Sequence, residues 1–140
     1  MQNLTKPTKV KNIVRAWHKI DVNDEILGRN ATKIAGLLMG KGKSYFAKNL
    51  DCGDYVVVTN AKTVKVTGHK ELQKVYTRYS GYPGGLHSAR LEEVRAKKPT
   101  EIVRHAVSGM LPKNKLRDQF LKRLYIYADD KHPYTEKFKI

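Results

Sequence analysis

The stretch that decides the fold is Asp54-Tyr55-Val56-Val57-Val58-Thr59, a short continuous run of β-branched residues. A strand that faces water on one side alternates apolar with polar residues, whereas an unbroken apolar run is typical of a strand buried on both faces. Strands of this kind belong to parallel sheets, whose connections pass through helices. Residues 54–59 therefore predict a central parallel strand and a fold of the α/β class.

Helical spacing is clearest from Leu27 to Met39, and Gly40 and Gly42 end that pattern. Three more helices are predicted: from Ser88 to about Ala96, from Pro99 to Met110, and over residues 116–124. Further strands are predicted at residues 13–20, 63–67, 74–79 and 125–127. Strands alternating with helices predict one compact α/β domain with a mostly parallel sheet. We expect a single domain over residues 1–140, with an N-terminal extension at 1–11, a core at 12–128 and a C-terminal tail at 129–140.

Charge is the strongest indication of function. The chain has 28 Lys and Arg residues against 13 Asp and Glu residues, a formal net charge of +15. Such an excess destabilises a compact protein through self-repulsion unless a polyanion neutralises it. The acid-poor stretches 1–20, 29–48 and 111–123 lie far apart in the sequence, which predicts several contact surfaces. We therefore expect a nucleic-acid partner, and no association with a membrane.

The sequence contains no motif that indicates catalysis or metal binding. Gly40-Lys41-Gly42-Lys43-Ser44 ends a helix instead of opening one, and its glycine spacing does not match a phosphate-binding loop. The five histidines show no ligand spacing, and the only cysteine, Cys52, lies between carboxylates that oppose thiolate formation. We therefore expect no catalytic residue, no metal, no cofactor and no small-molecule substrate. A lone cysteine also suits a reducing cytosol.

The glycine-rich loop Ser80-Gly81-Tyr82-Pro83-Gly84-Gly85 is a candidate for close contact with a ligand. Its glycines permit close backbone approach, and Tyr82 in the loop and Tyr79 just before it could stack on bases or could pack on the domain. Lys and Arg side chains from the acid-poor stretches would neutralise phosphates. The predicted RNA-binding residues are Lys9, Lys11, Arg15, Arg29, Lys33, Lys41, Lys43, Arg78, Tyr82, Gly84, Gly85, Arg90, Lys113, Lys115 and Arg117.

Several motifs, in this order, resemble one known family between about Val14 and His132. They are Trp17 with Asp21, Leu27-Gly28-Arg29, Leu38 to Lys41, Asp51-x-Gly53-Asp54-Tyr55-Val56-Val57-Val58, Asn60-Ala61-x-x-Val64, Thr67-Gly68 with Lys70, Ser80 to Gly85, Ala106-Val107-x-Gly109-Met110-Leu111-Pro112-Lys113-Asn114, Tyr127, and His132-Pro133. The chain is similar to the family of the thirteenth protein of the large ribosomal subunit, in its bacterial form.

The resemblance implies a three-layer α/β/α fold around a parallel sheet, with basic terminal extensions. It implies a structural, non-enzymatic protein of the large subunit that binds large-subunit ribosomal RNA and supports early subunit assembly. The implied neighbours are the third, twentieth and twenty-first large-subunit proteins, and the implied location is the cytoplasm, on the ribosome.

Two other interpretations remain open from the residues alone. A small nucleotide-binding α/β enzyme would share the fold class, although fold does not imply function. A free regulator that binds messenger RNA would share every basic feature.

Overall fold

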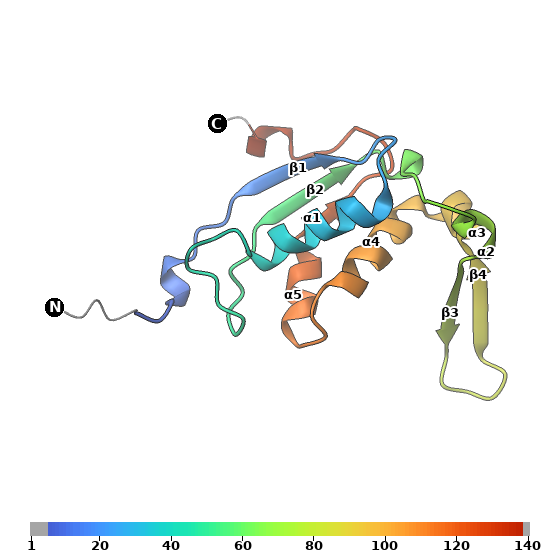
Figure 1. Ribbon diagram of the computed structural model, residues 1–140, viewed down its shortest axis with the longest axis horizontal. Helices are drawn as coiled ribbons and strands as arrows, with labels where there is room; N and C mark the ends of the chain where they lie inside the picture. Colours follow the sequence, from blue (N-terminus) through green and yellow to red (C-terminus); the bar gives the residue numbers. More distant parts are fainter. Residues whose placement is uncertain (1–5, 139–140) are drawn as a thin grey trace.

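The computed structural model of the chain describes residues 6–138, so residues 1–5 and 139–140 of the expected extensions lie outside the described residues. Its centre is a parallel three-stranded sheet with the order β1-β2-β5 (Figure 1). The strands are β1 (Trp17–Asp21), β2 (Tyr55–Thr59) and β5 (Leu124–Ile126). Trp17 pairs with Tyr55, and Val56 pairs with Leu124. The prediction of a central parallel strand from residues 54–59 is confirmed.

Helices α1 (Leu27–Met39), α4 (Pro99–Met110) and α5 (Leu116–Lys122) pack together below the sheet in Figure 1. Val56 and Val58 of β2 point into this side and are fully buried with Ile34 and Leu38 of α1 and Val107 of α4. Complete burial of such a side chain contributes about 1.5–3 kcal/mol. Helices packed in this way on a parallel sheet confirm the α/β class.

Aromatic side chains lie on the opposite face of the sheet. Trp17 stacks on Tyr55 with 4.4 Å between ring centroids, and Tyr125 lies 5.9 Å from Trp17. The chain beyond β5 then folds back, so that Tyr134 lies 5.1 Å from Trp17. A short 3₁₀ helix, η3 (Thr135–Phe138), follows there. The described part of the C-terminal tail thus packs on the second face of the sheet.

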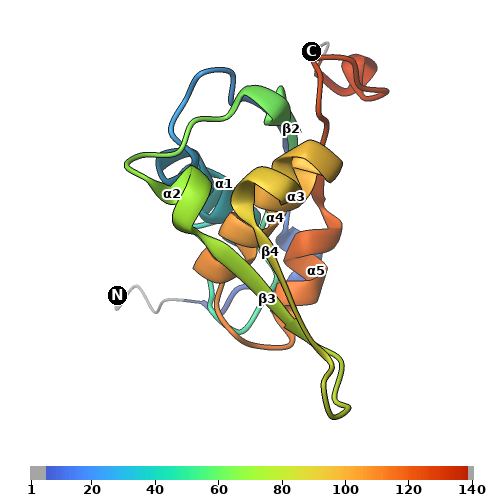
Figure 2. The same cartoon turned by 90° about the vertical axis from the view of Figure 1, so that its right-hand side faces the viewer.

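A second, smaller unit projects from the body (Figures 1 and 2). Strands β3 (Val75–Tyr79) and β4 (Leu86–Arg90) form an antiparallel hairpin, flanked by helices α2 (Lys70–Gln73) and α3 (Leu91–Lys97). Isolated two-stranded hairpins are marginally stable in water. The hairpin tip extends away from both the sheet and its helices, a position that suits contact with another molecule.

Two predictions about local structure were wrong. Residues 63–67 do not form a strand: Ala61–Thr63 is a 3₁₀ helix, η2, and only Lys65 makes a bridge, with Ile26. Pairing stops there because the chain enters α1 directly after Ile26. Residues around Ser88 do not start a helix either. Ser88 pairs with Thr77 in the hairpin, and α3 begins at Leu91.

Candidate nucleic-acid interface

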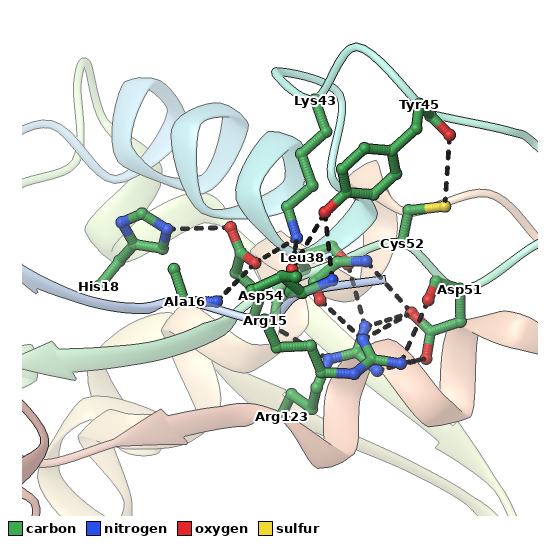
Figure 3. Close-up of polar contacts among 12 residues, drawn as sticks. Arg15, Ala16, His18, Leu38, Lys43, Tyr45, Asp51, Cys52, Asp54 and Arg123 are labelled. Atoms are coloured by element: carbon green, nitrogen blue, oxygen red, sulfur yellow. Dashed lines mark hydrogen bonds and ion pairs between the residues drawn. The ribbon is translucent and has the colours of Figure 1, made fainter. Parts of the chain in front are cut away.

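A buried ion network holds the body together beneath its basic surface (Figure 3). Arg123, only 8% exposed, precedes β5 and donates hydrogen bonds to both carboxylate oxygens of Asp51. The same guanidinium donates to the carbonyl oxygens of Leu38, at 3.2 Å, and Asp54, at 3.3 Å. Arg15 donates to the carbonyl oxygen of Gly53 at 2.6 Å. These contacts join the segment before β1, the end of α1 and the start of β5.

Asp54, at the start of β2, is the second centre of the network. Its carboxylate accepts hydrogen bonds from the backbone N–H of Ala16 at 2.9 Å and from the ammonium of Lys43, and it lies 3.0 Å from Nε2 of His18. Burial alone would raise the pKa of Asp54, but these hydrogen bonds outweigh it and hold the pKa below its usual value. Asp54 therefore remains ionised in the folded protein and fixes the loop that carries Lys43.

The pKa of Asp51 follows the same logic. Burial favours the neutral acid, while the hydrogen bonds and charge of Arg123, with Arg15 nearby, favour the carboxylate and lower the pKa overall.

Gly53 lies between the two aspartates, and a Cβ atom there would overlap the carbonyl of Leu38. Glycine is therefore required for this close approach of two backbones.

Gly40 confirms how the basic loop begins. It is the C-cap of α1 in the left-handed conformation, with φ 77°, and its N–H bonds the carbonyl oxygens of Gly36 and Leu37. The segment from Gly40 to Ser44 therefore closes a helix, as predicted, and its N–H groups do not form the cradle of a phosphate-binding loop.

Two of the predicted RNA-binding residues already have partners within the chain. The Lys43 ammonium bonds Asp54 and, at 2.6 Å, the carbonyl oxygen of Val14, and its side chain is only 16% exposed. Arg15 is half-buried against Asp51 and Gly53. Both side chains position the surface that the other cations occupy.

The other predicted residues are spread over several surfaces. Lys9 and Lys11 precede β1, Arg29 and Lys33 lie one turn apart on α1, and Lys41 follows α1. The hairpin carries Arg78, Tyr82, Gly84, Gly85 and Arg90, and the segment around the start of α5 carries Lys113, Lys115 and Arg117. The segment before β1 and the hairpin lie at opposite ends of the molecule (Figure 1). The structure does not bring these residues to one site.

The hairpin tip combines exposed apolar and cationic groups. Tyr82 is 75% exposed, and Tyr79 and Leu86, which pair across the strands, are each 64% exposed. The loop is held by two backbone hydrogen bonds, from Ser80 N–H to Gly85 and from Gly85 N–H to Tyr82. The tyrosine faces are therefore free in the described structure, which favours stacking over packing on the domain.

Sequence reasoning missed a cationic groove between α1, α2 and α4. It has a volume of about 580 Å³, and Arg29, Lys70, Lys74 and His105 are among its lining residues. The spacing of Lys70 and Lys74, which are one helical turn apart, indicates in the sequence that both could face one site. No sequence pattern indicates that His105 lies near them, because its position depends on how α4 packs.

Two other kinds of feature are absent from residues 6–138. This part of the chain has no group of three or more His, Cys, Asp or Glu residues placed to hold a metal ion. None of its helices is long and apolar enough to cross a membrane.

The structure thus belongs to the class of small, strongly basic α/β proteins whose buried ions serve architecture while most other cations face outward. Comparison with known proteins identifies the family. The family model described as "Ribosomal protein L13" matches residues 15–133. The chain belongs to this family. It is therefore a ribosomal protein and a structural one, not an enzyme, and the alternative of a nucleotide-binding enzyme is set aside.

Individual relatives support this over nearly the full chain. A protein of Solibacter usitatus is 52% identical over 92% of this chain and 90% of its own length. A protein of Dehalococcoides mccartyi is 46% identical over 95% of this chain and 93% of its own length. A protein of Helicobacter pylori is 47% identical over 94% of this chain and 94% of its own length. All three are named "Large ribosomal subunit protein uL13". The family resemblance seen in the sequence motifs is confirmed.

Proposed function

We propose that this protein is a structural constituent of the large ribosomal subunit that binds large-subunit ribosomal RNA and supports early assembly. The observation that carries the proposal is a net charge of +15 in a member of the L13 family. Most of the cations outside the buried network are exposed, and they occupy several surfaces at once. A protein arranged in this way can hold several RNA segments against one rigid body.

The mechanism is passive. Each exposed Lys or Arg that contacts a phosphate releases condensed counterions, and this release supplies most of the binding free energy. RNA is recognised by shape and by the positions of its phosphates, so no base-specific code is needed. The hairpin tip adds aromatic stacking through Tyr82, a contact that contributes about 1–3 kcal/mol per base.

The proposal extends to partners and location. Ribosomal RNA and other ribosomal proteins follow from family membership; the third, twentieth and twenty-first large-subunit proteins are the particular neighbours we propose, supported by the resemblance in sequence. We also propose a cytoplasmic location, on the ribosome, and a single domain with its core at residues 12–128.

Co-sedimentation tests the function. The protein should travel with large subunits through a sucrose gradient at low salt and should be released at high salt, because the contacts are ionic. A regulator of messenger RNA would instead sediment with free transcripts after ribosomes are removed. Recovery in the ribosome-free fraction at every salt concentration would contradict the proposal.

Acetylation tests the contact residues one by one. Exposed lysines such as Lys41 and Lys113 should react in the free protein and be protected in intact subunits. Lys43 is the internal control, because its ammonium is held by Asp54 and should be slow to react in both states. Equal reactivity of Lys41 and Lys113 in the free and bound forms would show that these lysines do not contact RNA.

A further inference from the structure

The cationic groove has an apolar floor and a basic rim. Leu27, Leu91, Ala106 and Met110 contribute apolar side chains to its lining. Its volume of about 580 Å³ leaves room for one nucleotide, whereas a folded RNA helix would meet only the rim. The groove therefore suits a single extruded group better than a continuous duplex.

The charged residues that line the groove are basic. Arg29, Lys70 and Lys74 are exposed lining residues, and no Asp or Glu is among the described lining residues. Glu71 lies beside Lys70 in the sequence, but Arg95 binds it with two hydrogen bonds, at 2.7 Å and 3.0 Å. The first turn of α1 holds no acid either, so the positive end of its dipole adds to the field. The groove thus favours an anion at its rim.

Two glycines keep the groove open. Gly28 of α1 and Gly109 of α4 both line it. Neither has a left-handed backbone, and a Cβ atom on either would meet nothing within 4 Å. Folding therefore does not require glycine at these positions, and glycine lowers helix stability relative to other residues. The space that they leave is explained if another molecule enters it.

We propose that this groove receives one unpaired nucleotide of the ribosomal RNA. The base lies on the apolar floor beside Gly28 and Gly109, and its phosphate meets Lys70, Lys74 and Arg29 at the rim. Single-stranded RNA is commonly recognised through splayed-out bases that stack on protein surfaces. The inference rests on the proposed function, because it names one subsite of the same RNA partner.

Chemical probing of the RNA bases tests the groove. Bound to large-subunit ribosomal RNA, the wild-type protein should protect an unpaired nucleotide that becomes reactive again with Gly109→Leu. The rest of the footprint should be unchanged. Gly36→Leu is the matched control. Gly36, on α1, is like Gly109 a helical glycine with open space at its Cβ position, but it does not line the groove, and the footprint of this variant should equal that of the wild type. Thermal unfolding should show both variants folded, since leucine favours a helix more than glycine does.

Lys74→Gln gives a second, independent test. It should weaken RNA binding about threefold to tenfold, as expected for one lost hydrogen bond, and Lys74→Arg should restore the affinity. Identical footprints of wild type and Gly109→Leu, or loss of the whole footprint by folded Gly109→Leu, would overturn the single-nucleotide site. The absence of any wild-type footprint would instead contradict the proposed function.

Discussion

Arg123 and Lys122 are adjacent basic residues with different roles. Arg123 is buried and binds Asp51, whereas Lys122, in the last turn of α5, is exposed. The sequence presents both as members of one basic stretch. Their difference follows from burial, because an arginine removed from water must have its donors satisfied. The partners of Arg123 lie up to 85 residues away, so local patterns could not reveal them.

Removing the Arg123 side chain should be strongly destabilising. Arg123→Ala leaves the Asp51 carboxylate without its main partner and should lower the free energy of unfolding by ~3–5 kcal/mol. Lys122→Ala should change it by less than about 0.5 kcal/mol. Urea unfolding followed by circular dichroism measures both. Similar stabilities for the two variants would show that the buried network contributes little.

The two aspartates predict sensitivity to acid. Their pKa values are lower in the folded protein than the usual 3.8, so the unfolded chain binds protons first as the pH falls. Their contribution to stability is present above about pH 4 and is lost as the pH falls through the lower, folded values. Unfolding measured from about pH 6 to pH 2 should show this loss. Asp54→Asn should reduce the slope, and an unchanged slope would contradict the role of Asp54.

At the scale of elements, the sequence predicts what depends on local periodicity. The helices at 27–39 and 99–110 and the strand at 55–59 were predicted closely, because burial on one or both faces leaves a repeating pattern. Strand β4 was missed since its residues are mostly exposed and pair only with β3. Residues 63–67 show the opposite error: they alternate like a strand but have no extended partner beyond Ile26.

The tail is the element whose position the sequence did not indicate. Its polar composition predicts an extension, yet Tyr134 packs on Trp17 and Tyr125, with 4.6 Å between the rings of Tyr134 and Tyr125. Burial of the Tyr125 hydroxyl is the largest cause of its raised pKa, and the neighbouring Tyr134 is the next. The tail therefore forms part of the sheet's second face.

Tyr134→Ala should loosen that face. The variant should lose ~1–2 kcal/mol of stability through lost aromatic contact. The fluorescence of Trp17, the only tryptophan, should shift to longer wavelength as water reaches it. Tyr82→Ala at the exposed hairpin tip is the control and should change neither quantity. An unshifted Trp17 spectrum in Tyr134→Ala would show that the tail does not cover the sheet.

At the scale of the whole molecule, charge and fold serve different ends. The parallel sheet, its helices and the buried ions form a rigid body. The remaining cations bind that body to a polyanion. The sequence was sufficient for the class of partner, because net charge needs no coordinates. It was not sufficient for the groove, whose lining residues lie within 26–29, 66–74 and 105–110, together with Leu91, and meet only in the folded chain.

The most direct test of this account is the salt dependence of binding to large-subunit ribosomal RNA. If the exposed cations contact about five or more phosphates, the logarithm of the binding constant should fall against the logarithm of salt concentration with a slope of about −4 or steeper. A variant in which four exposed lysines, Lys9, Lys11, Lys113 and Lys115, are changed to Gln should give a visibly shallower slope. Absence of binding at low salt, or a slope close to zero, would contradict the claim that the excess positive charge exists to hold RNA.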